Sequence, residues 1–140
     1  MTQPHFGKVD EDSPKPVYAQ IVAGLATALV TQSVVSSITY RVDEYASRDD
    51  AVACTDPTEI TDDTTLTKTS VIWDTLQTSG DGGAIVTDKG TGYNFATIIP
   101  SASFTTGGKW YGIEVWITPS SGDAYRAAWY VLECAASAKS

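Results

Sequence analysis

Apolar and polar side chains alternate with a period of two along most of the chain after residue 17. The clearest early run is residues 34–45, in which apolar positions such as Ile38, Tyr40 and Val42 alternate with polar ones. Two further long runs, residues 109–118 and 124–134, flank the turn-forming residues Pro-Ser-Ser-Gly. Because successive side chains of a strand point to opposite faces of a sheet, this period predicts half-buried β-strands, and the last two runs predict a β-hairpin.

Shorter segments extend the same pattern along the chain. Short strands are expected at residues 17–23, 51–54, 71–76 and 93–99, and the threonine-rich residues 58–70 are expected to form short exposed strands. Non-strand segments are expected at residues 24–32 (a loop or a short helix), 47–50 (a polar turn) and 77–92 (a glycine-rich loop or hairpin tip). Strands about ten residues apart with turn signals between them favour one antiparallel β-sandwich domain over residues 17–136.

The two ends of the chain depart from this pattern. Residues 1–16 contain prolines, which cannot donate backbone hydrogen bonds, and three consecutive acids that repel one another. We therefore expect an extended N-terminal arm over residues 1–16, either disordered or lying along a partner protein. The arm residues expected to contact such a partner are Pro4, His5, Phe6, Val9, Pro14 and Pro16. Residues 137–140 are expected to form a short flexible tail.

Charge and length narrow the class of protein. The 140 residues suffice for one domain with a real core. Asp and Glu number 17 against 9 Lys and Arg, and the net charge is −8. An acidic domain repels nucleic acid and anionic lipid, so we expect neither as a partner. The N-terminal residues lack the apolar run of a signal peptide, and no stretch approaches the roughly 20 apolar residues that span a bilayer, which indicates synthesis in the cytoplasm.

Residues suited to catalysis or metal binding are sparse. His5 is the one histidine, and an arm cannot easily hold its imidazole beside a nucleophile. Adjacent acids such as Asp62 and Asp63 are more typical of solvated turns than of paired catalytic carboxylates. A calcium site from these two, or from Asp81 and Asp88, stays open, although no run matches a calcium-binding loop. We expect no enzymatic activity, no cofactor and no bound metal, and a site made of carboxylates alone stays open.

Two cysteines leave two alternatives. Cys54 and Cys134 could form a disulfide that ties an early strand to the last one, which would stabilise the fold by about 4 kcal/mol in the chain-entropy model. The alternative is that they remain reduced thiols, as is usual after cytoplasmic synthesis. Their spacing does not suit zinc, and the only histidine is distant in sequence.

Tryptophans mark a candidate contact surface. Trp110 and Trp116 are an even number of residues apart, so they share one face of the expected strand at residues 109–118. The opposite face carries Tyr111, Ile113, Val115 and Ile117. The two indoles could be covered by the rest of the protein, could contact another protein, or could stack on a sugar. Trp73 is a further candidate for sugar stacking.

Residues 70–133 resemble a known group of proteins. VIWDTLQT at residues 71–78 is followed by GYNFATIIPSASFTTGGKWYGIEVWITPSSGDAYRAAWYVLE at residues 92–133, and VSSITYRV stands at residues 35–42. These segments contain, in order, a DTLQT segment, a GYNF strand ending at proline, a Gly-Gly turn, an aromatic strand, T-P-x-x-G and a final aromatic strand. This order of motifs is similar to that of small β-sandwich proteins encoded in bacteriophage structural gene clusters. Gly92 stands in this pattern where the chain needs a positive φ or a close approach.

The resemblance implies an immunoglobulin-like β-sandwich without catalytic residues. It implies a non-enzymatic virion structural protein, made in the host cytoplasm, and first of all a capsid decoration or cement protein on the head surface. Its partners would be the major capsid protein or other virion proteins, and a homo-oligomer, such as a trimer on a capsid threefold axis, would fit that role. A tail or neck accessory or adaptor protein is the alternative, and a carbohydrate-binding module is a further one.

Overall fold

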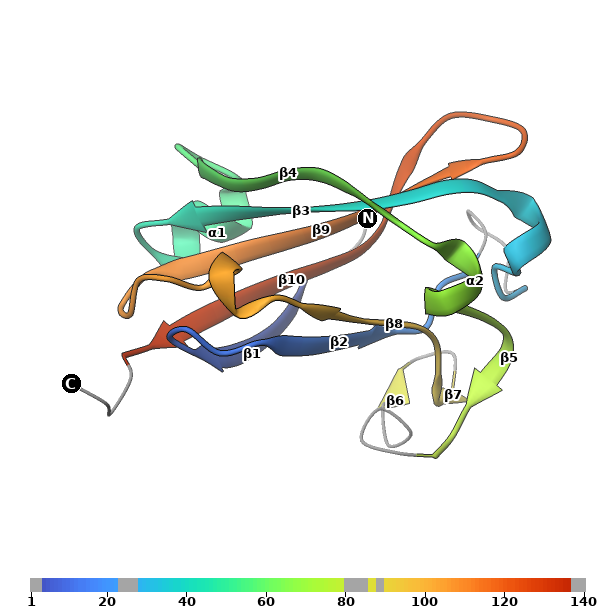
Figure 1. Cartoon of the computed structure of the whole chain (residues 1–140), viewed down its shortest axis with the longest axis horizontal. Helices are drawn as coiled ribbons and strands as arrows, with labels where there is room; N and C mark the ends of the chain where they lie inside the picture. The colour runs from blue at the N-terminus through green and yellow to red at the C-terminus, as the bar shows by residue number, and fades with distance from the viewer. Residues whose placement is uncertain (1–3, 23–27, 80–85, 88–89, 137–140) are drawn as a thin grey trace.

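Two β-sheets pack face to face in the computed structural model, which describes residues 4–22, 28–79, 86–87 and 90–136 (Figure 1). The five-stranded sheet has the order β1-β10-β9-β3-β4, and the three-stranded sheet has the order β2-β8-β5. Two short strands, β6 and β7, pair separately. The fold is all-β, as the sequence pattern predicts.

Ten strands and four helical elements are assigned in the described residues. The strands are β1 (His5–Asp10), β2 (Lys15–Ala19), β3 (Val35–Tyr45), β4 (Thr58–Leu66), β5 (Ile72–Gln77), β6 (Val86–Thr87), β7 (Gly90–Thr91), β8 (Tyr93–Ile99), β9 (Trp110–Pro119) and β10 (Tyr125–Ala135). The helical elements are α1 (Arg48–Ala53), α2 (Lys68–Val71) and the 3₁₀ turns η1 (Gln32–Val34) and η3 (Ser101–Ser103).

The core lies between the two sheets. Ile38 of β3 and Ile113 of β9 join Phe95 and Ile99 of β8 in one cluster of side chains without solvent exposure. Burying a side chain of this size contributes about 1.5–3 kcal/mol to stability. The period of two therefore predicts the inward face of β9 correctly, and that of β3 from Ile38 to Val42. At the start of the segment it is wrong: Val34 is 43% exposed and Val35 is buried, because the strand register shifts between Val35 and Ser37. The expected hairpin is also confirmed, because β9 and β10 pair antiparallel around the turn that contains Gly122.

The N-terminal segment belongs to both sheets. β1 pairs in parallel with β10 from His5 to Asp10, and β2 pairs antiparallel with β8. Between the two strands, the Asp12 amide donates to the Phe104 carbonyl at 2.7 Å. The structure thus corrects the expectation of a separate arm: residues 5–10 and 15–16 lie in strands of the two sheets, and Pro16, the last residue of the expected arm, lies inside β2. The backbone of β10 supplies hydrogen-bond partners, and Val9 enters the core with 5% exposure.

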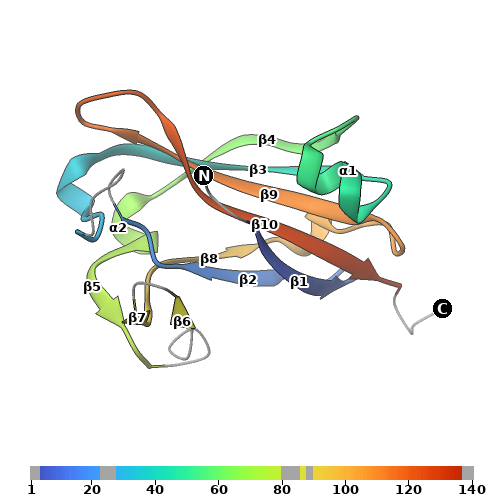
Figure 2. The same ribbon diagram turned by 180° about the vertical axis from the view of Figure 1, so that it is seen from behind.

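A helix replaces the turn and short strand expected at residues 47–54. The side chain of Ser47 accepts a hydrogen bond from the Asp50 amide at 3.1 Å and caps the start of α1. Asp49 and Asp50 lie in the first turn, where the helix dipole favours negative charge. Cys54 adopts the left-handed conformation that ends the helix. α1 packs on the face of the five-stranded sheet that points away from β8 and β2 (Figure 2).

The remaining expectations are met in part. The threonine-rich segment forms one mostly exposed strand, β4, and then the short helix α2. The strands expected near residues 71–76 and 93–99 are present as β5 and β8, whereas β2 ends earlier than the expected strand at residues 17–23. Parts of three predicted segments lie outside the described residues, namely 23–27 of the first loop, 80–85 and 88–89 of the glycine-rich segment, and the tail at 137–140.

Gly92, between β7 and β8, meets both conditions that favour glycine. Its φ is +112°, and a Cβ built there would lie 2.7 Å from the backbone oxygen of Gln77. We expect Gly92→Ala to lower the free energy of unfolding by about 2–4 kcal/mol, because strain and a backbone clash add. Urea denaturation measures this loss. Gly108→Ala is the matched control, since Gly108 has a φ of +86° but no atom within 4 Å of a built Cβ. Equal losses in the two variants would contradict the clash.

Candidate binding surfaces

The predicted contact residues lie on different parts of the molecule. Val9 is buried in the core and is unavailable to a partner, which corrects its place among the contact residues. Phe6 is 50% exposed and lies under the guanidinium of Arg48, 4.2 Å from its ring centroid. Pro4 is half-buried, and Pro14 is exposed. The structure does not bring these residues together with the tryptophans into one site.

The first candidate surface is a hollow between β1 and β2, where the two sheets part at one edge. Its volume is about 310 Å³, and its lining includes His5, Pro16 and Tyr130. The imidazole of His5 stacks on the Tyr130 ring, with centroids 5.2 Å apart. The Tyr130 hydroxyl donates to the Tyr18 carbonyl at 2.7 Å and joins β10 to β2. Desolvation lowers the pKa of His5 and raises that of Tyr130, which favours the neutral form of each group.

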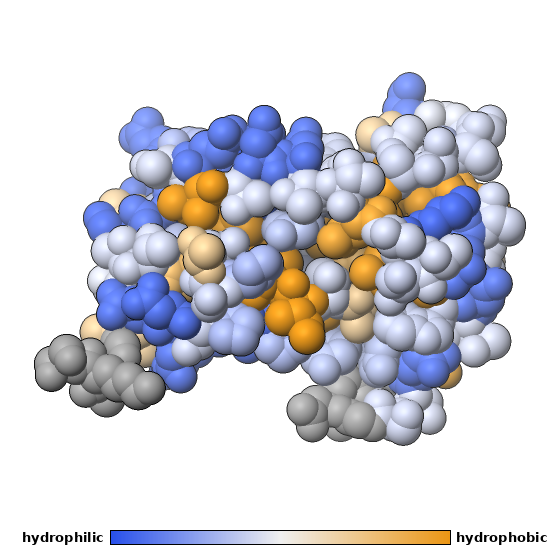
Figure 3. All heavy atoms as spheres, viewed as in Figure 1, coloured by the Kyte–Doolittle hydropathy of each residue, from blue (hydrophilic) through white to orange (hydrophobic). Residues whose placement is uncertain are grey.

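The second candidate is the outer face of the three-stranded sheet, called the β2–β8 surface below. It contains a hollow of about 580 Å³ lined mostly by apolar and aromatic side chains: Pro16, Tyr18, Ser70, Val71, Tyr93, Ala96, Thr97 and Ile98. Ile98 is 66% exposed, more than any other exposed large hydrophobic side chain of the described residues. Figure 3 shows apolar surface over the part of the molecule where β8 lies. An exposed apolar face of this kind is typical of a contact surface.

Aromatic packing holds one wall of the β2–β8 surface in place. The rings of Tyr18 and Tyr93 meet edge to face, with centroids 5.0 Å apart. Trp73 of β5 packs edge to face on Tyr93 at 5.5 Å. Such pairs contribute about 0.5–1.5 kcal/mol beyond the burial of their area. The wall is therefore already ordered, and a partner that docks on it does not have to fix these rings.

The third candidate is a hollow on the outer face of the five-stranded sheet, called the Trp116 hollow below. Its volume is about 370 Å³. Its lining comes from β3, β4, β9 and the segment before β10: Thr39, Arg41, Asp63, Glu114, Trp116, Thr118 and Ala124. Residues two apart share a strand face, so Glu114, Trp116 and Thr118 all point into this hollow from β9.

Ion pairs fix the charged side chains around the Trp116 hollow. Arg41 donates from Nε and Nη2 to the two carboxylate oxygens of Asp43, both at 2.9 Å, and Asp43 is 3% exposed. Arg126 donates to Glu114 Oε2 at 2.9 Å, and its guanidinium lies 4.0 Å from the Trp129 ring centroid. The hydrogen bond to Asp43 raises the pKa of Arg41, with further contributions from neighbouring carboxylates. The guanidinium of Arg41 therefore stays charged at any ordinary pH.

The structure gives the two outward-facing tryptophans different roles. Tyr111, Ile113, Val115 and Ile117 are fully buried, so the predicted division of β9 into two faces is confirmed. Trp110 packs against a second buried cluster formed by Tyr45, Ala51, Trp129 and Val131, which α1 covers. Trp116 instead lines an open hollow. Packing within the protein accounts for the position of Trp110. Trp116 therefore remains the candidate contact residue.

The two cysteines are free thiols in the structure. Cys54 is exposed and follows α1 on the outer face of the five-stranded sheet, whereas Cys134 is buried in the core between the sheets. The sheet lies between them, so the disulfide alternative is not realised. Burial and nearby carboxylates, with Glu11 first among them, raise the pKa of Cys134. Its thiol is therefore held in the protonated form, which is a poor nucleophile.

The described part of the chain offers neither a metal-ion cluster nor a membrane-spanning helix. Within it, no group of three or more His, Cys, Asp or Glu side chains is placed to hold a metal ion. No helix of the described residues has the length and apolar character needed to cross a membrane. Every buried side-chain nitrogen or oxygen of those residues has a hydrogen-bond partner.

No protein-family model, curated protein or solved structure matches this chain. Function is therefore inferred from the surfaces described above and from the resemblance of residues 70–133.

Proposed function

We propose that this protein is a non-enzymatic structural component of a bacteriophage virion, and specifically a decoration protein that docks on the head through the β2–β8 surface. One observation carries this proposal: Ile98 stands 66% exposed on a pre-ordered apolar and aromatic face. The resemblance of residues 70–133 supplies the phage context. An immunoglobulin-like sandwich is part of the proposal, supported by two face-to-face sheets that share the N-terminal segment.

The chemistry of the β2–β8 surface suits docking on another protein. Apolar and aromatic side chains dominate the centres of protein interfaces, and rigid ones lose little conformational entropy on binding. The net charge of −8 disfavours contact between free copies in solution. On a shell, many equivalent sites raise the effective concentration and turn a modest contact into stable attachment. The major capsid protein is the expected partner, and a trimer at a capsid threefold axis is the expected arrangement.

Ile98→Asp is expected to weaken attachment to expanded capsids by about thirtyfold or more, because a carboxylate would be desolvated at the centre of the contact. Cosedimentation of the purified protein with capsids that lack it measures the change. Val52→Asp is the matched control, since Val52 is 38% exposed on α1, away from the β2–β8 surface. Circular dichroism confirms that both variants fold. Unchanged attachment of the Ile98 variant would contradict the proposed docking face.

The number of copies per virion distinguishes the proposed head location from the tail or neck alternative. Quantitative mass spectrometry of purified virions gives the ratio of this protein to the major capsid protein. A ratio that corresponds to on the order of hundreds of copies supports the head. A few to some tens of copies per particle would assign the protein to the tail or neck. Its absence from purified particles would overturn both virion roles.

A further inference from the structure

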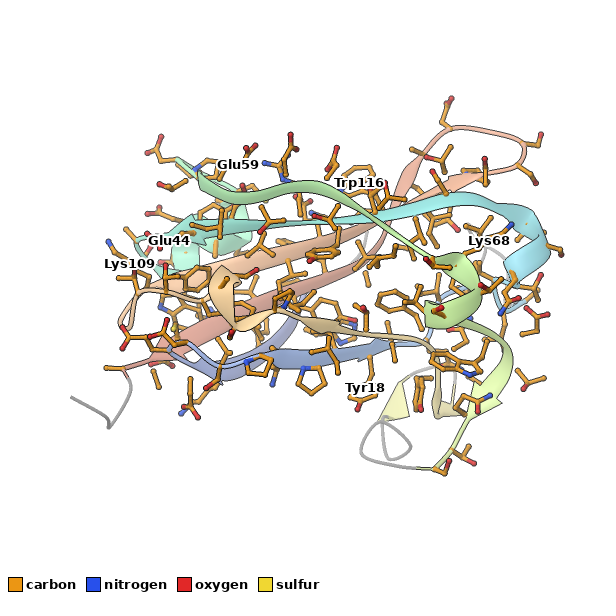
Figure 4. All side chains as sticks on the ribbon, in the orientation of Figure 1. Tyr18, Glu44, Glu59, Lys68, Lys109 and Trp116 are labelled. Atoms are coloured by element: carbon orange, nitrogen blue, oxygen red, sulfur yellow. The ribbon has the colours of Figure 1, made fainter. Side chains whose placement is uncertain are left out.

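The Trp116 hollow is left free by the proposed docking. Figure 4 shows Trp116 and Tyr18 on opposite sides of the molecule, and Tyr18 belongs to the β2–β8 surface. A protein docked through that surface would still present the Trp116 hollow to solvent. The hollow combines one indole with a guanidinium, two carboxylates and two threonine hydroxyls, and no structural role described above uses all of these groups together.

We propose that the Trp116 hollow binds a neutral pyranose sugar, as found at the end or along the chain of a surface glycan. The proposal rests on the lining of this hollow and does not depend on the virion role. Of the three tryptophans that the sequence offers for sugar stacking, the structure favours Trp116, because Trp116 lines a hollow, whereas Trp110 packs against the cluster that includes Ala51 of α1 and Trp73 packs on Tyr93.

The indole of Trp116 provides the apolar part of the recognition. One face of a pyranose ring carries several C–H bonds, whose hydrogens are slightly positive. The face of an indole is slightly negative, so the two surfaces attract each other and exclude water between them. Trp116 is only partly buried and lines the hollow directly. The volume of about 370 Å³ lies at the small end of the range of roughly 300–1,000 Å³ for small-molecule sites.

The polar rim provides the orienting part. A sugar hydroxyl both donates and accepts a hydrogen bond, so it pairs well with a mixture of carboxylates, guanidinium and hydroxyl groups. Glu114 and Asp63 offer acceptors, Arg41 offers donors, and Thr39 offers either. Arg41 and Glu114 are held by their ion pairs before any ligand arrives. These side chains are therefore already ordered, and they lose little conformational entropy when a ligand binds.

The charges around the hollow disfavour an anionic ligand. Four carboxylates lie in or beside it against two arginines: Asp43, Glu59, Asp63 and Glu114 against Arg41 and Arg126. The excess of negative charge repels a sugar that carries a carboxylate or sulfate. Arg41 is already paired with Asp43, so its guanidinium does not create a separate positive site. A neutral molecule with one apolar face and several hydroxyls fits the indole and the mixed donors and acceptors of the rim.

The first test is a titration of the isolated full-length chain. Binding is measured by intrinsic tryptophan fluorescence and by calorimetry. The ligands are maltohexaose, cellohexaose, laminarihexaose, mannohexaose and galactohexaose, each added up to about 10 mM. This concentration detects weak binding, with dissociation constants in the millimolar range. We expect at least one of these neutral sugars to bind. The monosaccharide unit of that sugar is then compared with its uronic acid, which should bind about tenfold more weakly or worse. Absence of binding across the panel overturns the proposal, and so does equal or tighter binding of the uronic acid.

The second test places the bound sugar. Trp116→Ala should weaken binding by about tenfold or more, while Trp116→Phe, which keeps an aromatic face, should retain part of it. Trp73→Ala is the matched control and should bind as the parent chain does. Urea unfolding checks that each variant folds. Binding that survives Trp116→Ala, or that is lost equally in the Trp73 variant, places the sugar elsewhere and overturns the assignment. Because no capsid is present, this result is independent of the head-attachment measurement.

Discussion

Replacing Asn94 by leucine is expected to lower the free energy of unfolding by about 3–5 kcal/mol. Asn94 is 1% exposed and acts as a bridge to two segments of the N-terminal region. Its Oδ1 accepts from the Ile21 amide at 2.6 Å, and its Nδ2 donates to the carbonyls of Ile21 and Val30 at 3.0 and 3.1 Å. Leucine has a similar size but leaves the Ile21 amide and the Val30 carbonyl buried without these partners. Each orphaned group costs about 1–3 kcal/mol.

Urea denaturation of the Asn94 variant checks this expectation. The control is Gln77→Leu, an amide-to-leucine change at a residue whose side-chain hydrogen bonds within the described part of the chain are exposed and local, to Thr75. We expect the control to change the free energy of unfolding by no more than about 0.5 kcal/mol. If the two variants lost the same stability, the bridging hydrogen bonds of Asn94 would contribute nothing beyond the loss of an amide.

Phe104→Ala should also cost about 3–5 kcal/mol of unfolding free energy. Phe104 follows η3, has no solvent exposure, and packs edge to face on Tyr111 with ring centroids 5.3 Å apart. The ring occupies the core beside β9, so its removal leaves a cavity that the surrounding strands cannot fully close. The same region holds the Tyr111 hydroxyl, which accepts from the Thr106 amide and donates to Glu44 Oε2. A cavity there loosens these bonds as well.

Thermal and urea unfolding measure the loss, and Phe6→Ala serves as the control. Phe6 is the same residue type on the surface, 50% exposed beneath Arg48. Its removal forfeits a partly exposed cation–π contact, which contributes about 0.5–1 kcal/mol. A loss at Phe6 as large as that at Phe104 would show that β1 contributes more to stability than its exposed side chains indicate.

The fold presents two different faces. The β2–β8 surface is apolar and pre-ordered, which suits burial against a protein, and the Trp116 hollow is polar with one indole, which suits a small hydroxylated ligand. Because these surfaces lie on opposite sides, one molecule could attach to a shell and still expose its binding hollow (Figure 4). The Ile98 and Trp116 variants test the two faces separately, since each leaves the other face intact.

The sequence alone determined those features that depend on neighbours along the chain. The period of two assigned the inward face of β9 and that of β3 from Ile38 to Val42. The Pro-Ser-Ser-Gly run located the turn of the last hairpin, and Gly92 marked a position that needs positive φ. The spacing of Trp110 and Trp116 also placed both indoles on the outward face. These outcomes follow from local geometry, in which side-chain direction and backbone conformation are set within a few residues.

The helix α1 shows where local reasoning gives the wrong answer. Residues 47–54 contain a serine cap and two acids that favour a helix start, but they are too few for a period of 3.6 to stand out from an alternating pattern. Whether they form a helix depends on the surface of Tyr45, Trp129 and Val131 that Ala51 covers. That surface comes from two strands, β3 and β10, which are far apart in the chain, so no short window of sequence contains it.

Only the tertiary structure decided the path of the N-terminal segment and the difference between the two tryptophans. Prolines and acids in residues 1–16 predict weak local structure, yet β1 and β2 are ordered by the backbone of β10 and β8, more than 75 residues away in the chain. Trp116 lines a hollow because Arg41, Asp63 and Glu114 arrive beside it from three strands. Backbone hydrogen bonds between distant strands leave no periodic mark in a sequence, so pairing partners, and every site built across strands, emerge only when the sheets assemble.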